Sequence, residues 1–168
     1  MCFNIVCTFI YVRIGGRIVK EYEINSSTLC IYPIDKDRSY VYELDDQFEV
    51  DMSCFDIINK SCLFFGSSYT GRRNGSTSLL NSTHKVPILI EESTEIIFFP
   101  TASVNNINCI WISYNNLESI KKIDKNYSDV LFKQNREFKM KISYFILTNQ
   151  VIRAKRLKSE FNIRKKAF

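Results

Sequence analysis

Three short apolar runs in the middle of the chain constrain its fold more than any other feature. They are residues 88–90, 96–99 and 109–112, and all three contain isoleucine, joined by leucine, phenylalanine or tryptophan. Polar, turn-forming residues separate one run from the next. Short apolar runs without polar alternation are typical of strands that are covered on both faces. We therefore expect these runs to form central strands of a buried β-sheet.

Weaker strand signals lie on both sides of this centre. Residues 21–33 hold apolar residues around an Asn-Ser-Ser turn, which predicts a hairpin within that segment. Residues 40–44 predict another strand. Residues 130–142 predict a half-exposed hairpin, because Lys139 and Lys141 alternate there with apolar residues.

Two helices are expected. Ser53 followed by Asp56 is an approximate capping box, and apolar residues at helical spacing lead from it to Gly66, which predicts a helix near 53–65. The second helix is expected near 143–162, where apolar residues at helical spacing form one face and basic residues crowd the rest.

These signals predict one α+β domain over residues 21–168, with a mainly antiparallel sheet, a central helix and a basic C-terminal helix. Residues 1–20 would be an N-terminal extension. Its first 14 residues are apolar but shorter than the roughly 20 residues that a membrane span needs, and they lack the pattern of a secretory signal. A mis-assigned start is the alternative: Gly15-Gly16 could be encoded GGA-GGA, a ribosome-binding sequence, with Val19 read from a GTG start. The codons of residues 15–19 test this hypothesis.

Charge is unevenly distributed along the chain. The net charge is +5, but residues 21–60 hold ten acidic and three basic residues, whereas residues 133–168 hold eleven basic and two acidic residues. Such asymmetry indicates a basic surface that faces a polyanion. A solvated basic tail is the alternative interpretation.

Residues 61–75 combine three glycines, which allow unusual backbone conformations, with two adjacent arginines. An apolar run ends at a glycine and leads to Arg72 and Arg73, which lie between Gly71 and Gly75. Glycines favour a turn and allow close approach of a ligand, and two guanidinium groups suit phosphates or a narrow, electronegative DNA groove. We therefore expect a loop that presents both arginines to DNA. The alternative is a helix-capping turn with two solvated arginines.

Further DNA contacts are expected near this loop and on the C-terminal helix. Hydroxyl and basic groups near the loop are suited to phosphate contacts, and so is the basic face of the helix, although a solvated helix face is the alternative there. The full set of expected DNA-binding residues is Ser67, Ser68, Tyr69, Arg72, Arg73, Lys85, Arg153, Lys155, Arg156 and Lys158.

The cysteines give no sign of a metal site or a disulfide framework. Six cysteines contain no C-x-x-C pair, and His84 is the single histidine, so neither a metal nor another cofactor is expected. Cysteines in apolar runs are typical of buried residues in a reducing cytosol. Nucleophilic catalysis by Cys62 with His84 as base is the enzymatic alternative, but an apolar environment suppresses thiol reactivity, and we expect no enzyme.

Several separated motifs resemble one family. The motif at residues 61–72, Ser-Cys-Leu-Phe-Phe-Gly-Ser-Ser-Tyr-Thr-Gly-Arg, is followed in order by His-Lys-Val-Pro-Ile at 84–88 and Phe-Phe-Pro-Thr at 98–101. Trp-Ile-Ser at 111–113 continues the series, and later short motifs extend it toward residue 157. The chain is similar in these motifs to ComK, a family of bacterial competence transcription factors.

The resemblance implies a cytoplasmic, nucleoid-associated activator of DNA-uptake genes. It also implies binding to paired AT-rich boxes of double-stranded DNA through the minor groove, homo-oligomers, and control by an adaptor of a Clp protease. The chain departs from the family in its N-terminal extension, and it stops soon after the last helix, whereas some members carry a longer C-terminal tail.

Two alternatives remain open. A shortened paralogue would keep the fold and act as a regulator or decoy through protein–protein interaction, without activating transcription; the acidic segment at residues 35–56 could dock a partner. Single-stranded nucleic acid is the other alternative ligand, although most aromatic residues lie in expected core runs.

Overall fold

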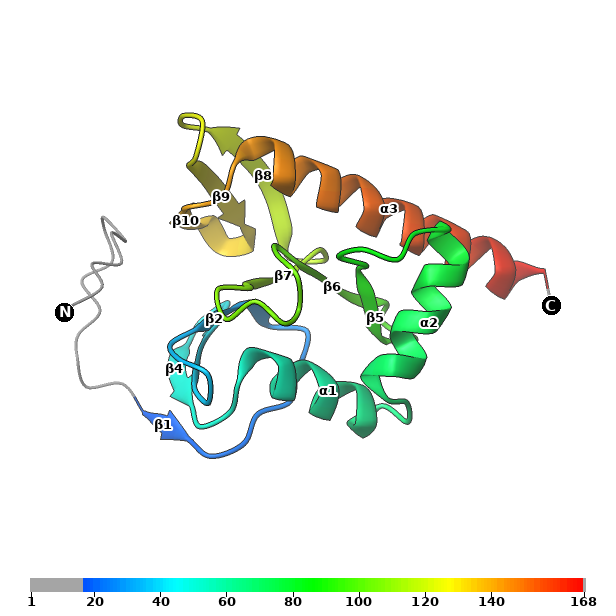
Figure 1. The fold of residues 1–168 in the computed structure, drawn as a ribbon, viewed down its shortest axis with the longest axis horizontal. Coiled ribbons are helices and arrows are strands. Elements are labelled where there is room, and N and C mark those ends of the chain that lie inside the picture. Colours follow the sequence, from blue (N-terminus) through cyan, green and yellow to red (C-terminus); the bar gives the residue numbers. More distant parts are fainter. Residues whose placement is uncertain (1–16, 168) are drawn as a thin grey trace.

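The computed structural model describes residues 17–167. Most of the predicted extension, residues 1–16, lies outside this range. Within residues 17–167, three α-helices and ten strands follow one another (Figure 1). The helices are α1 (Cys54–Phe64), α2 (Tyr69–Leu80) and α3 (Tyr144–Lys166). The strands are β1 (Ile18–Val19), β2 (Thr28–Pro33), β3 (Ser39–Glu43), β4 (Gln47–Val50), β5 (Ile88–Glu91), β6 (Ile96–Pro100), β7 (Trp111–Ser113), β8 (Leu117–Lys122), β9 (Ser128–Phe132) and β10 (Arg136–Met140), with a short 3-10 turn, η1 (Lys133–Asn135), between the last two.

The larger sheet has seven strands in the order β1-β4-β3-β2-β7-β6-β5. All its pairings are antiparallel except that of β1 with β4. Every residue of β6 and β7 is buried, which confirms the prediction that these apolar runs are central strands. The run in β5 is also a strand, but it lies at the edge of the sheet, where α1 and α2 pack against it.

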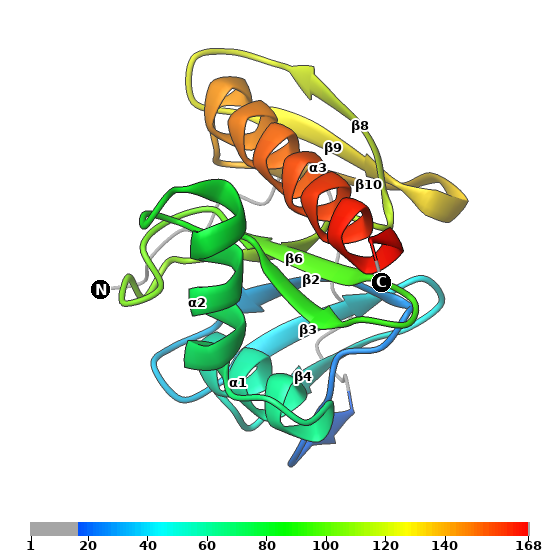
Figure 2. The ribbon, with the colours of Figure 1, turned by 90° about the vertical axis from the view of Figure 1, so that its right-hand side faces the viewer.

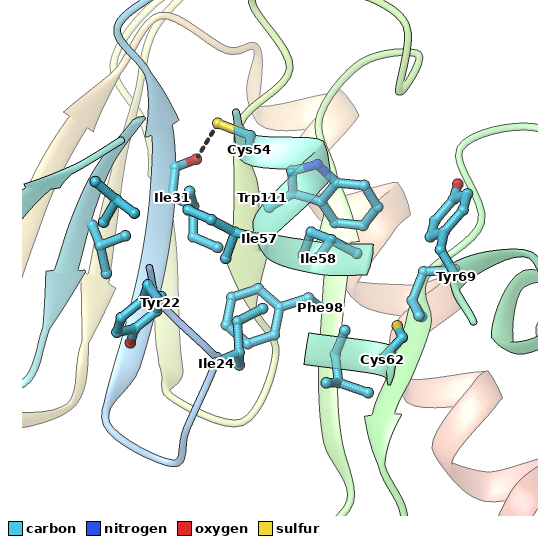
Figure 3. Packing of buried hydrophobic residues seen from close by; sticks show 14 of the residues in the cluster. Tyr22, Ile24, Ile31, Cys54, Ile57, Ile58, Cys62, Tyr69, Phe98 and Trp111 are labelled. Carbon is cyan, nitrogen blue, oxygen red and sulfur yellow. Dashed lines mark hydrogen bonds between the residues drawn. The ribbon is translucent and has the colours of Figure 1, made fainter. Parts of the chain in front are cut away.

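Strand alternation divides the core into two clusters, one on each face of the larger sheet. Phe98 and Trp111 point to the face that α1 covers, where they meet Ile57 and Ile58 (Figure 3). Their neighbours along the strands, such as Phe99, point to the other face. The sheet is therefore covered on both sides by apolar layers, as its uniformly apolar central strands require.

The second face is covered by α3 and by a smaller sheet of three strands, in the order β10-β9-β8 (Figure 2). The predicted half-exposed hairpin forms the β9–β10 pair of this sheet. Ser128 at the end of β9 donates a hydrogen bond of 2.8 Å from its hydroxyl to the carbonyl of Ile142, which fixes the chain just before α3. Leu147, Ala154 and Leu157 are the fully buried residues of α3.

The predictions of α1 and α3 are confirmed. Ser53 caps α1 by accepting a bond of 3.0 Å from the amide of Asp56, and Gly66 follows the helix with a left-handed φ of 81°. Ser143 caps α3 in the same way, by accepting from the amide of Ile146. The helix continues to Lys166, beyond the predicted end near residue 162. The fold is therefore α+β with a basic C-terminal helix, as predicted.

Two expectations about secondary structure were wrong. Residues 69–80 form α2 instead of a loop. Residues 21–24 are not a strand, and β2 pairs with β3 rather than within a hairpin at 21–33. Instead, the amide of Ile24 donates to the hydroxyl of Ser61, at 2.9 Å, so this segment packs across α1. The short strands β4 and β8 were also not predicted, because β4 alternates over only four residues and β8 mixes apolar and charged residues with little periodic signal.

Candidate nucleic-acid interface

Arg72 is not presented outward by a glycine-bracketed turn. It lies in the first turn of α2, and its side chain is 13% exposed. The guanidinium group forms an ion pair with Glu92 and donates to the carbonyl of Phe65 at 3.2 Å. Its Nε atom is buried without a hydrogen-bond partner. The charge of Arg72 is thus already used to join α2 to the turn between β5 and β6.

The small residues before Arg72 form the N-terminus of α2. The hydroxyl of Ser68 accepts a bond of 3.0 Å from the amide of Gly71, and this cap starts the helix. A Cβ atom on Gly71 would lie 2.8 Å from the hydroxyl of Ser67, so glycine fits here because of crowding rather than a turn. Tyr69 is buried between Phe55 and Trp111, and burial raises the pKa of its hydroxyl.

Three of the other expected contact residues lie at the segment that follows α2, residues 81–85: they are Arg73, Arg153 and Lys85. Arg73 donates to the carbonyl of Thr83 at 2.8 Å. Arg153, on α3, donates to the hydroxyl of Ser82 and to the carbonyl of Lys85, the latter at 3.3 Å. Burial lowers the pKa of Arg153. Both arginines therefore hold this segment against the helices, and of the three only the Lys85 side chain is exposed.

The remaining expected contact residues lie on α3, and they differ in whether an ion pair already holds their charge. Lys158 pairs with Glu95 at 3.0 Å, and this contact lowers the pKa of the glutamate. Lys155 and Arg156 are exposed, and within residues 17–167 neither forms an ion pair. They are the two cations of α3, among those predicted, that are open to a ligand.

The expected residues do not gather on one surface. Ser67, Ser68 and Arg72 lie at the N-terminal end of α2, whereas Lys85 and Arg153 lie beyond its C-terminal end. A helix of 12 residues is about 18 Å long. The sequence therefore identified two separate groups of residues, and only the second group adjoins α3.

Exposed cations without ion pairs are concentrated in the last third of the chain, and most of them were missed. Residues 117–166 contain fourteen basic and five acidic residues, whereas residues 17–116 contain eight basic and thirteen acidic residues. In the earlier segment, five of the eight cations form ion pairs: Arg17, Lys36, Arg38, Lys60 and Arg72. In the later segment, within the described part of the chain, Lys158 alone does so.

The unpredicted members of this group belong mostly to the smaller sheet. Six of them are Lys121, Lys122, Lys125, Lys133, Lys139 and Lys141, and the other three are Arg164, Lys165 and Lys166 at the end of α3; all nine are exposed. Their signal in the sequence was the charge of the segment as a whole. It was diluted by Glu118, Asp124, Asp129 and Glu137, which lie just before or between the lysines along the chain.

The candidate nucleophile is buried. Cys62 is fully buried on α1, and burial raises the pKa of its thiol to about 11. A thiol in such surroundings is a poor nucleophile at neutral pH. Residues 17–167 contain no cluster of side chains able to hold a metal ion, and no helix among them is long and apolar enough to cross a bilayer.

Together these features define an α+β protein in which acidic residues outnumber basic ones in residues 17–116 and basic residues outnumber acidic ones in residues 117–166. Charge separation of this kind is typical of proteins that present one surface to a polyanion.

A family model described as ComK protein matches residues 19–166. The competence transcription factor of Bacillus subtilis (strain 168) is 34% identical over 149 residues, which cover 87% of this chain and 78% of that protein. No solved structure matches the chain. The chain therefore belongs to the ComK family.

Proposed function

We propose that this protein binds double-stranded DNA and activates transcription of competence genes; its Bacillus subtilis relative is named a competence transcription factor. The observation that carries the proposal is the group of exposed cations without ion pairs on α3 and the smaller sheet. Cations that are free of intramolecular partners can release condensed counterions from DNA, and that release drives binding to phosphates.

We propose further that the protein reads AT-rich boxes through the minor groove. A-tracts have a narrow minor groove with a strongly negative potential, which attracts arginine and lysine. Arg156, Lys155 and Lys85 are the predicted contacts whose side chains are exposed on or near α3, and we propose that they bind the phosphates that border the groove. The DNA contacts of Arg72, Arg73, Arg153 and Lys158 stay predictions, and each would require its cation to leave the protein group that it now binds.

A set of four labelled probes tests this proposal. They are an AT-rich duplex, a mixed-sequence duplex, a single strand, and a duplex in which inosine–cytosine pairs replace the A·T pairs. Inosine–cytosine keeps the minor-groove acceptor pattern of A·T but presents a different major groove. We expect affinity in the order AT-rich, inosine–cytosine, mixed duplex, with the first two close. Equal affinity for AT-rich and mixed duplexes, or loss of binding on inosine–cytosine, would contradict minor-groove reading.

A promoter reporter then distinguishes an activator from a decoy. Raised transcription from a competence promoter that carries the AT-rich boxes supports activation. Binding without raised transcription would support the shortened-paralogue alternative.

The other expectations implied by the family stay proposals. They are a homo-oligomer, control by a Clp-protease adaptor, and a cytoplasmic, nucleoid-associated location. Sedimentation velocity with and without the AT-rich duplex measures the first of these. A single monomeric boundary in both conditions would contradict it.

A further inference from the structure

The turn between β8 and β9 has a fixed shape. We call residues 121–127 the hairpin tip. The amides of Ile123 and Asp124 both donate to the carbonyl of Tyr127, at 3.1 and 3.2 Å. The carboxylate of Asp124 accepts from the amides of Asn126 and Tyr127, at 2.7 and 2.9 Å. One oxygen of the only acidic side chain in the tip thus accepts two backbone donors, and these bonds hold the turn in one conformation.

The lysines of the hairpin tip point in different directions and, in the described part of the chain, form no ion pair. In the ladder of the smaller sheet, Lys121 is opposite Asp129, whereas Lys122 is opposite Ser128. Neighbouring residues of a strand face opposite sides of the sheet, so Lys121 and Lys122 extend from opposite faces of the hairpin. Lys125 is exposed in the turn itself. Within residues 17–167, none of the three forms an ion pair.

An apolar side chain lies between these lysines. Ile123 is 40% exposed at the bend of the hairpin, although the rest of the tip is polar apart from Tyr127. The ammonium group of Lys139 lies over the ring of Tyr127, 5.4 Å from the ring centre. Proteins that bind the minor groove commonly combine flanking cations with an apolar side chain that enters the groove.

The hairpin tip lies beside the N-terminal end of α3, the helix that carries Lys155 and Arg156 further along. In both ribbon views the bend between β8 and β9 lies beside the N-terminal end of α3 (Figures 1 and 2). Lys155 and Arg156 lie about three turns further along the helix, roughly 17 Å from its start. One turn of duplex DNA is about 34 Å long, so the tip and the middle of α3 can reach phosphates of the same turn.

We propose that the hairpin tip is a second DNA contact. Lys121 and Lys122 bind phosphates on the two strands that border a groove, and Ile123 enters the groove between them. This inference rests on the proposed function, because it assigns part of the same DNA interface. It names a surface that none of the expected site residues included.

The first experiment measures the salt dependence of binding to the AT-rich duplex. Each lost phosphate contact lowers the slope of log K against log salt by about 0.9. Lys121→Ala/Lys122→Ala is therefore expected to lower the slope by about 1.8 and to weaken binding on the order of tenfold near physiological salt. The matched control is Lys20→Ala/Lys36→Ala, which removes two exposed lysines from the acidic half and should leave the slope unchanged.

The second experiment tests the apolar contact. Ile123→Ala is expected to weaken binding several-fold without changing the salt slope, because an apolar contact releases no counterions. Ile107→Ala removes an isoleucine that is 57% exposed in another turn, and it should bind like the wild type. Circular dichroism shows that each variant is folded.

The outcomes separate this inference from the proposed function. In one outcome the wild type binds duplex DNA, Lys155→Ala/Arg156→Ala weakens that binding, and both hairpin variants bind like the wild type. The hairpin inference is then wrong and the proposed function stands. If the wild type ignores duplexes at low salt, the proposed function itself fails. A reduced salt slope for the lysine variant together with reduced affinity for Ile123→Ala supports the hairpin contact.

Discussion

At the scale of single residues, Arg72 was predicted to bind DNA, but in the structure its side chain links parts of the fold. Its guanidinium group joins Glu92 to the carbonyl of Phe65, so removal of the side chain leaves a half-buried acceptor without a donor. Arg72→Ala should lower the free energy of unfolding by about 1–3 kcal/mol. Urea denaturation measures this change, and Asn74→Ala, an exposed neighbour in the same helix, is the control that should change little.

The same ion pair gives a direct test of whether Arg72 also contacts DNA. Glu92→Gln releases the guanidinium group from its carboxylate. A DNA contact by Arg72 would then become stronger, and affinity for the AT-rich duplex would rise. Unchanged affinity, with the expected loss of stability in Arg72→Ala, would assign this residue to the fold alone.

Glu91 makes stability depend on pH in the acidic range. Burial by itself would raise the pKa of this carboxyl group, but hydrogen bonds from Thr94 and Ser93 outweigh burial and lower the pKa to about 2 from 4.5. A lowered pKa stabilises the folded state above pH 4.5, and that stabilisation is lost as the pH falls toward 2. The stability difference between the wild type and Glu91→Gln should therefore shrink over this interval. A constant difference in urea titrations would contradict the assignment.

At the scale of secondary-structure elements, α2 is where sequence and structure diverge most. Its two glycines and its serines and threonines are weak helix formers, so local propensity favours a loop. Packing decides otherwise, because Tyr69, Ser76 and Leu80 recur at helical spacing and are buried. Gly66, in contrast, does occupy a turn, with a φ of 81°.

This difference between the glycines can be measured. Gly75 lies inside α2, and a Cβ atom added there would have no neighbour within 4 Å, so Gly75→Ala should stabilise the protein by about 0.5–1 kcal/mol. Gly66→Ala should destabilise it by about 1–2 kcal/mol, because alanine is strained at that φ. Thermal denaturation of the two variants measures both changes. A loss of stability in Gly75→Ala would favour the loop that the sequence predicted.

Elements with strong local signals were predicted correctly, and elements defined by tertiary contacts were not. Residues close together in the sequence are enough to predict the caps at Ser53 and Ser143 and the apolar strands β6 and β7. The cationic surface could be inferred as a net charge. Which cations are free could not, because it depends on partners that are distant in sequence: Glu95 and Lys158 are 63 positions apart.

At the scale of the whole molecule, the separation of charge sets how the protein would approach DNA. Residues 17–116, the half that contains the larger sheet, hold thirteen acidic and eight basic residues, and residues 117–166, the half with the smaller sheet and α3, hold fourteen basic and five acidic residues. A duplex is attracted to the second half and repelled by the first. Orientation before contact therefore comes from the field of the whole molecule rather than from any one side chain.

Substitutions on α3 test this view of the molecule. Lys155→Ala/Arg156→Ala should lower the salt slope by about 1.8 and weaken binding to AT-rich and mixed duplexes by similar factors, because phosphate contacts carry no sequence information. The free energy of unfolding should stay close to that of the wild type, since both side chains are exposed and unpaired within residues 17–167. An unchanged slope would exclude this part of α3 from the interface. A loss confined to the AT-rich duplex would instead mean that these side chains enter the groove, where Arg156 could read its width.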